Sequence, residues 1–316
     1  MSKSEVAIDY TDVRERIRSH SGSVASRKIR ERIIEGGMFL CAVFSVAVTV
    51  GIVWVLVYES WNFFRNVSLI DFLTDTQWTV LFENPRYGIL PLVTGTLVTS
   101  MIALVVALPL GTIIAIYLSE YANSTVREIL KPILELLSAV PTVVFGYFAL
   151  LFVTPMLQNI LPELPGFNML SAGIVIGIMI VPYVSSLSED AMKAVPVTIR
   201  EGSYAMGATR VQTALRVLMP AAFSGIASAY VLGFSRAVGE TMVVALAAGT
   251  QPNLTLNPME GAATITAYIV QVSLGDLPHG SIAYQSIFAA GLTLMVMTLV
   301  FNIGGYFLRK RFREVY

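Results

Sequence analysis

Long runs of apolar residues are the feature that most constrains this chain. A membrane-spanning helix needs about 20 largely apolar residues, and six segments meet this requirement. They are 38–57, 89–118, 136–157, 166–187, 217–249 and 282–308. Only 13% of the residues are charged, about half the share that is usual in soluble domains. The sequence therefore predicts an all-α, polytopic membrane protein with six transmembrane helices.

The basic residues lie almost entirely on one side of the predicted spans. If both termini are cytoplasmic, the inner segments are 1–37, 119–135, 188–216 and 309–316. These hold eighteen of the 21 Lys and Arg residues. The outer segments hold only Arg65 and Arg86, and Arg236 lies inside a span. An excess of Lys and Arg in cytoplasmic loops is the positive-inside signal, so we predict that both termini are cytoplasmic.

The charged N-terminal segment differs in composition from the rest of the chain. We divide the chain into a cytoplasmic tail, residues 1–37, and a transmembrane domain, residues 38–316. Charge runs of this kind are usually solvated, which favours a solvated helix or a disordered tail. A specific binding role for the tail is the alternative.

Few side chains in this sequence are suited to metal binding or catalysis. One cysteine, Cys41, forms neither an intrachain disulfide nor a zinc site, and His20 and His279 have no partners at metal-ligand spacing. The predicted spans contain no histidine, and we recognise no pairing of a nucleophile with a base. The ATP-binding pattern G-x-x-x-x-G-K-[ST] is absent. We therefore predict no metal, no cofactor, no enzymatic activity and no nucleic-acid partner.

The predicted cytoplasmic loop 188–220 contains the stretch EGSYAMGATRVQTALRVLMP, which begins at Glu201. Pro196 ends the preceding helix, and Thr198, three residues before Glu201, indicates a capping box for a new helix. Gly207 weakens a helix by about 1 kcal/mol, which favours a bend or the close approach of another backbone. Two alternatives stay open. The loop helix packs on its own bundle, or it fits a groove on a partner protein.

The fifth predicted span contains two charged residues in the stretch SRAVGETM. A charge at the membrane centre costs about 3 kcal/mol. Arg236 and Glu240 are four residues apart, so on a helix they share a face and neutralise each other. One alternative is a structural ion pair that locks two spans. The other is an arginine that meets an anionic solute, with Glu240 holding it in place.

The loop resembles the EAA loop of ABC-importer permeases. That pattern has a Glu, two small residues, a Gly six positions after the Glu, then an aliphatic residue and a Leu-Pro pair. The corresponding residues here are Glu201, Gly202, Ser203, Gly207, Val217, Met219 and Pro220. Gly-Ser, Val and Met replace Ala-Ala, Ile and Leu. The resemblance implies a type I importer permease with a MetI-like core, whose loop docks into a cleft on a cytoplasmic ATPase.

SRAVGETM also resembles the R-A-x-G-E-T segment of permeases in phosphate-specific ABC importers. The stretch SAVPTVVFGYFAL at 138–150 is closer to the PstC subunit than to its sister PstA, and the similarity covers most of residues 85–316. It implies passage of inorganic phosphate along a pathway that includes Ser235, Arg236, Glu240 and Thr241. Arginine suits this task because its planar fork binds oxyanions through two hydrogen bonds.

Two other kinds of transporter stay open as alternatives. One is a permease for another oxyanion, sulfate or molybdate. The other is an ATP-independent secondary transporter, which often shows internal repeats and several intramembrane acids. This sequence has no clear repeat, and Glu240 is the one acid deep in a span.

The resemblance further implies partners and a location. The partners are a PstA-like second permease subunit, a PstB-like cytoplasmic ATPase dimer and a PstS-like extracytoplasmic phosphate-binding protein. The location is the bacterial inner, or plasma, membrane, in contact with lipid.

Two local patterns predict how the spans pack. Gly173 and Gly177 form a G-x-x-x-G pattern, which predicts close packing of two helices within the chain. Pro141 and Pro182 each remove a backbone hydrogen bond and are expected to bend their spans.

Overall fold

The computed structural model describes the backbone of residues 10–80, 82, 84–275, 277–278 and 280–311, and their side chains except those of 10–26 and 308. Within these residues the regular structure is helical, with one isolated β-bridge between Trp78 and Tyr87. The predicted all-α class is confirmed. Contacts divide the chain into two units, residues 1–55 and 56–316.

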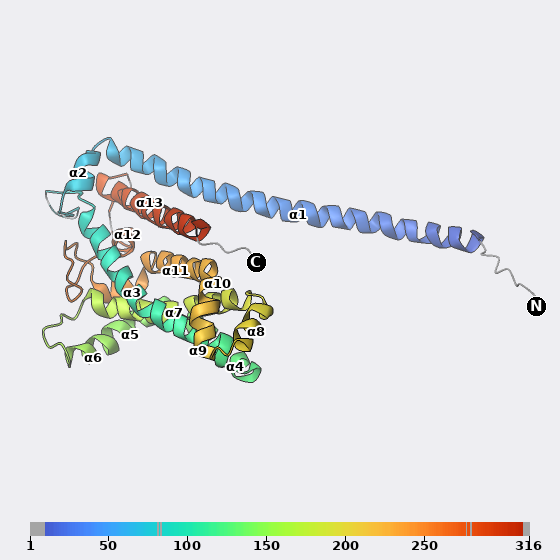
Figure 1. Cartoon of the computed structure of the whole chain (residues 1–316). Helices are drawn as coiled ribbons and strands as arrows, with labels where there is room; N and C mark the ends of the chain where they lie inside the picture. The colour runs from blue at the N-terminus through green and yellow to red at the C-terminus, as the bar shows by residue number, and fades with distance from the viewer. Residues whose placement is uncertain (1–9, 81, 83, 276, 279, 312–316) are drawn as a thin grey trace, which may run out of the picture. The chain divides into compact units, whose positions relative to one another are not determined.

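The first unit consists of most of α1, which runs from Tyr10 to Phe64 (Figure 1). Its apolar side chains are exposed, including Phe39 and Trp54. A helix that is apolar all round suits the interior of a bilayer, and the predicted span 38–57 lies within it. Residues 10–37 continue the same helix, in agreement with the helical alternative for the tail. Residues 1–9 lie outside the described part.

The second unit contains three long apolar helices, α3 (Leu90–Ile116), α7 (Met169–Lys193) and α13 (Ile282–Arg311), joined by shorter helices and π-helical turns. The shorter elements are α2 (Leu69–Thr74), η1 (Tyr117–Tyr121), α4 (Ser124–Ala139), α5 (Thr142–Phe148), η2 (Ala149–Val153), α6 (Thr154–Gln158), α8 (Val197–Ala205), α9 (Arg210–Thr213), η3 (Ala214–Leu218), α10 (Met219–Ala221), α11 (Phe223–Val238), η4 (Val244–Ala248) and α12 (Ile265–Ser273). Figure 1 shows α13 alongside α11, which it contacts.

The core of the second unit is built on the contact between α3 and α7. A Cβ atom on Gly173 would lie 2.6 Å from the Cβ of Ile102, and one on Gly177 would lie 2.8 Å from the carbonyl oxygen of Ala103. Small residues allow two helix backbones to approach this closely. The predicted packing role of the G-x-x-x-G pattern is therefore confirmed.

Two of the six predicted spans are broken rather than continuous. The predicted span 136–157 starts inside α4, and the chain bends by 86° before it continues from Thr142 to Gln158. Pro141 stands at this break and accounts for it, because proline cannot donate the next helical hydrogen bond. The predicted span 217–249 contains a 77° bend between the segments Arg210–Ala221 and Phe223–Val238.

The number of spans depends on how these bent pairs are counted. In the described chain, four helices are long and apolar enough to cross a membrane, and the number rises to six if each bent pair is one span. The predicted six spans correspond to the larger number. Pro182, which was also expected to bend its span, lies inside α7 without interrupting it.

Loops that were predicted to lie on the same side of the membrane meet in the structure. The ring of Trp78, from the outer segment 58–88, packs edge-to-face on Tyr268 from segment 250–281, with centroids 5.0 Å apart. Burial raises the pKa of Tyr268 to about 12, so its hydroxyl stays protonated. The inner segments 119–135 and 188–216 meet through ion pairs. The grouping of the loops agrees with the predicted topology, and the cytoplasmic location of the termini stays a prediction.

The α3–α7 contact predicts a specific loss of stability. Gly177→Ala places a methyl group against a backbone oxygen, and overpacking of this kind costs about 1–3 kcal/mol. Gly304→Ala in α13, where a Cβ meets no atom of the described residues within 4 Å, is the matched control. Thermal unfolding of the detergent-solubilised protein should show a lower midpoint for Gly177→Ala alone. Equal midpoints for the two variants would contradict this account of the core.

Candidate functional site

The loop between α7 and α11 starts differently from the sequence prediction. α8 begins directly after Pro196, which occupies the N-cap position without a side-chain hydrogen bond. The predicted capping box of Thr198 and Glu201 is wrong, because both residues lie within α8. Pro196 has an extended ψ of 135°, so the helix starts one residue later, at Val197. A capping box stands instead at α9, where Thr209 and Gln212 each bond the backbone N–H of the other.

Gly207 forms the turn between α8 and α9. Its φ angle is +85°, in the left-handed region that favours glycine. Within the described chain, no heavy atom lies within 4 Å of where its Cβ would be. The sequence predicted either a bend of the chain or the close approach of another backbone at Gly207, and the structure shows the bend.

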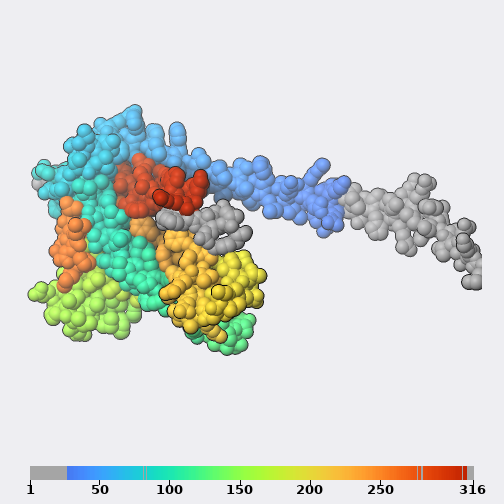
Figure 2. Space-filling view, in the orientation of Figure 1, coloured from blue at the N-terminus to red at the C-terminus, as the bar shows by residue number. Residues whose placement is uncertain are grey.

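The loop lies on the surface. Figure 2 shows α8 and α9, in yellow and gold, together on the face in view and beside α4. No residue of α8 is fully buried, but Ile199 packs against a buried apolar cluster. The helix therefore contacts its own bundle on one side and presents its other side to the surroundings. Glu201, Gly202 and Pro220 are exposed, and the Ser203 hydroxyl lies 2.9 Å from that of Thr213. Large apolar side chains are exposed along the loop at Val197, Tyr204, Met206, Val211 and Leu215.

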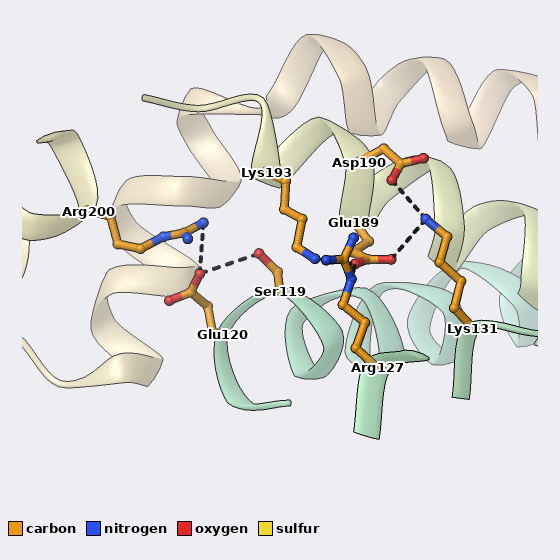
Figure 3. Close-up of polar contacts among 8 residues, drawn as sticks. All are labelled: Ser119, Glu120, Arg127, Lys131, Glu189, Asp190, Lys193 and Arg200. Carbon is orange, nitrogen blue, oxygen red and sulfur yellow. Dashed lines mark hydrogen bonds and ion pairs between the residues drawn. The ribbon is translucent and has the colours of Figure 1, made fainter. Parts of the chain in front are cut away.

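Glu120, near the end of the helix that begins as α3, holds the loop through polar contacts (Figure 3). Its side chain is only 2% exposed and lies 3.1 Å from Nη2 of Arg200. The Tyr204 hydroxyl donates to the other carboxylate oxygen at 2.8 Å, and Arg210 donates to the Glu120 carbonyl at 3.5 Å. Burial and the bond to this carboxylate raise the pKa of Tyr204, so its hydroxyl remains a donor.

Glu189, near the end of α7, is a second buried carboxylate with cations around it (Figure 3). Its side chain is fully buried. Oε1 lies 2.6 Å from Nε of Arg127 and 2.7 Å from Nζ of Lys193, and Oε2 lies 3.5 Å from Nζ of Lys131. Lys131 also contacts Asp190 at 3.0 Å. Because two of these cations belong to α4, the cluster fastens α4 to α7.

Arg236 faces α7 rather than Glu240. Its guanidinium lies over the ring of Tyr183, with Cζ 4.2 Å from the centroid, a geometry that stabilises a cation electrostatically. The predicted ion pair with Glu240 is wrong, since no carboxylate pairs with Arg236 in the described chain. Its Nε is buried and has no hydrogen-bond partner. The guanidinium therefore keeps donors that an oxyanion accepts.

Glu240 has a local role in the backbone. α11 ends at Val238 and Gly239 is its C-cap, so Arg236 and Glu240 do not share a helix face and the expected four-residue pairing does not arise. The Glu240 carboxylate accepts a bond from the N–H of Val243 at 3.4 Å. This is the start of the helical segment that leads into η4, where a negative charge is favourable.

The other two predicted pathway residues make separate contacts. The Ser235 hydroxyl donates to the carbonyl of Val231 at 3.0 Å and lies 3.3 Å from Oδ1 of Asn302 in α13. The Thr241 hydroxyl donates to the carbonyl of Gly239 at 3.2 Å. In the part of the chain that the structure describes, no side-chain hydrogen bond or ion pair joins two of the four predicted pathway residues. Arg236 is the one with an unpaired buried donor.

The described residues contain no group of three or more His, Cys, Asp or Glu side chains that could hold a metal ion. A cleft of about 710 Å³ lies beside η4, with Tyr147, Phe167, Leu246 and Gln251 in its lining. That lining carries no charged side chain, so the cleft offers an anion no opposite charge.

Residues 107–314 match the family described as the inner membrane component of binding-protein-dependent transport systems. The chain belongs to this family. The predicted recognition as an importer permease is confirmed.

Curated relatives cover most of the permease. The probable ABC transporter permease protein YqgH of Bacillus subtilis is 35% identical, over 92% of this chain and 93% of that protein. The probable phosphate transport system permease protein PstC of Methanocaldococcus jannaschii is 31% identical, over 78% and 83% of the two chains. The phosphate transport system permease protein PstC 1 of Mycobacterium tuberculosis is 33% identical, over 74% and 80%.

Solved structures confirm the predicted importer-permease fold. A bacterial ABC transporter that imports alginate has a TM-score of 0.58 at 18% identity, over 85% of this chain and 95% of that chain. The inward-facing MetNI methionine ABC transporter has a TM-score of 0.53 at 18% identity, over 72% and 95%. At these identities the likeness shows the fold alone.

Sequence reasoning did not select Tyr183, Glu120 or Glu189. Tyr183 is one aromatic residue in an apolar span, and nothing local distinguishes it. The two acids carried a usable signal, because each lies two residues after a predicted span, in a segment that also contains Lys and Arg. A carboxylate in that position has cations within reach.

The turn at Gly207 predicts that a side chain there is harmful. Gly207→Ala forces a left-handed backbone on an L-residue, at a cost of about 1–2 kcal/mol. Gly202→Ala, where a Cβ also meets no atom within 4 Å but φ is not positive, is the control. Hydrogen–deuterium exchange of residues 197–213 should increase in Gly207→Ala only. Wild-type exchange in that variant would show that the turn does not require glycine.

The Glu189 cluster predicts different effects of two adjacent substitutions. Glu189→Gln leaves three cations, 25–36% exposed, without their shared carboxylate. The expected cost is lower than the about 3–5 kcal/mol of a fully buried pair, because water reaches these cations, but it is larger than that of an exposed pair. Asp190→Asn removes a carboxylate that is 56% exposed, where an ion pair is worth about 0–1 kcal/mol. Thermal unfolding in detergent should separate the two variants, and similar midpoints would contradict the assigned importance of Glu189.

Proposed function

We propose that this permease carries inorganic phosphate into the cytoplasm as half of the membrane-spanning part of an ABC importer. The observation that carries the proposal is Arg236, a cation in a membrane helix with no carboxylate beside it in the described chain. Placing such a charge in a membrane costs free energy, and binding of an anionic solute would account for an arginine at this position. Relatives whose names specify phosphate transport support phosphate as that anion.

Each nearby residue has a part in this proposal. Arg236 binds phosphate oxygens through its planar fork. Tyr183 supports the guanidinium through its ring, 4.2 Å away, without consuming a hydrogen-bond donor. Glu240 fixes the chain where α11 ends, and Ser235 and Thr241 flank the same region of the pathway.

The proposal includes partners. A PstA-like permease subunit completes the pathway, and a PstS-like binding protein delivers phosphate at the outer face. A PstB-like ATPase dimer docks on the loop 188–220, where α8 presents exposed apolar side chains beside Glu201. The complex lies in the bacterial inner, or plasma, membrane, with six spans and both termini of this chain in the cytoplasm.

Substitution of Arg236 tests the proposed pathway. Hydrogen bonds to charged groups are worth about 1.5–3 kcal/mol, so Arg236→Gln should reduce phosphate uptake by about 10–100-fold while the complex still assembles. Uptake of radiolabelled phosphate at low concentration is measured in cells that lack other phosphate systems. Arg65→Gln, an exposed arginine in the outer segment 58–88, should transport normally. Full uptake by Arg236→Gln would remove Arg236 from the pathway.

Competition in the same cells tests the identity of the anion. Unlabelled sulfate or molybdate should not reduce phosphate uptake. Competition by either oxyanion, or no loss of phosphate uptake on deletion of the gene, would reassign the substrate. Uptake that continues after ATP depletion would favour a secondary transporter.

A further inference from the structure

The loop helix α8 is joined to the membrane-spanning helices by Ile199, which packs against a buried apolar cluster that includes Ala115 and Met192, and by polar contacts. No residue of α8 is buried, whereas the Glu120 side chain that it contacts is 2% exposed. Arg200 and Tyr204 are four residues apart, and therefore lie on one face of α8. Both reach the Glu120 carboxylate. One carboxylate near the end of α3 thus receives two side chains of the loop helix.

The contact between Glu120 and Arg200 depends on charge. Nη2 lies 3.1 Å from Oε1. Nη2 and Nε of Arg200 are both buried, and neither has a hydrogen-bond acceptor among the described residues. A buried cation in this state depends on the opposite charge beside it. Glutamine at position 120 keeps an oxygen for Tyr204 but leaves the guanidinium without compensation.

α9, the second helix of the loop, also contacts Glu120. Arg210, the first residue of α9, donates to the Glu120 carbonyl at 3.5 Å and lies over the ring of Tyr121 at 5.9 Å. α3 packs along α7, and Tyr183 of α7 lies against Arg236. A continuous series of contacts therefore leads from the loop to the proposed anion site.

We propose that Glu120 is a positioning residue that transmits movement of the loop to α3, and so couples ATP hydrolysis to transport. The inference rests on the proposed function, because it takes the loop as the docking site of the ATPase. A carboxylate that served only stability would alter folding. It would leave unchanged the number of solute molecules moved for each ATP hydrolysed.

The ratio of transport to hydrolysis is the first test. In the reconstituted complex, Glu120→Gln is expected to assemble and hydrolyse ATP but to move far less phosphate for each ATP. Glu128→Gln, an exposed carboxylate in α4 with no ion pair in the described chain, should match the wild type. Arg200→Gln should reproduce the loss, and the double variant should be no worse than either single one, because both remove the same contact. A wild-type ratio in Glu120→Gln overturns the inference.

A second measurement requires neither phosphate nor ATPase. In the purified full-length permease, Glu120→Gln should increase hydrogen exchange of the α8 amides by about tenfold, and Glu128→Gln should not. If Glu120→Gln fails to fold, Tyr204→Phe removes only the hydroxyl donor and should cause a smaller increase. Unchanged exchange in α8 overturns the inference even where the wild type imports phosphate. If exchange in α8 increases but the wild-type permease does not import phosphate, then the proposed substrate is wrong and the role of Glu120 stands. The ratio of solute transported to ATP hydrolysed is then measured with the solute that is imported.

Discussion

The close contact between α3 and α7 is the constraint on which the second unit depends. In a bilayer the lipid is as apolar as the side chains, so helices associate through van der Waals packing where their surfaces fit. Gly173 and Gly177 provide that fit, because a Cβ at either position would collide with α3. α11, α4 and η4 then pack on α7. The positions of the charged side chains follow from this arrangement.

α7 connects the two regions that bear on function. Tyr183, within α7, contacts Arg236, and Glu189, near its end, gathers the cations of α4. α3, packed against it, ends close to Glu120 and the loop helix. A displacement of the loop that moved α3 would therefore reach the neighbourhood of Arg236 through packed helices. The buried Glu120 carboxylate attaches the loop helix to the helix that begins as α3, and the buried Glu189 carboxylate attaches α4 to α7. Polar contacts at these helix ends and apolar packing between α3 and α7 therefore connect the loop to α7.

The sequence predicted the apolar segments well and their continuity less well. The segments 89–118, 166–187 and 282–308 each overlap a long helix closely, because hydrophobicity over about 20 residues is a local property. The segment 217–249 is apolar except for Arg236 and Glu240, yet the chain bends by 77° near its start and the helix α11 ends at Val238. The expected pairing of Arg236 with Glu240 was wrong because it assumed that the helix continues past Val238.

Composition and local patterns by themselves determined that this chain is an all-α membrane protein with Lys and Arg concentrated in alternate loops, a glycine pair for helix packing and a loop that resembles those of importers. Each of these depends on residues close together in the sequence. Only the tertiary structure decided that Arg236 lies on Tyr183, that Glu120 holds α8, and that Glu189 binds α4. These contacts join residues from 53 to 84 positions apart, and local periodicity carries no information about which distant helix supplies a partner.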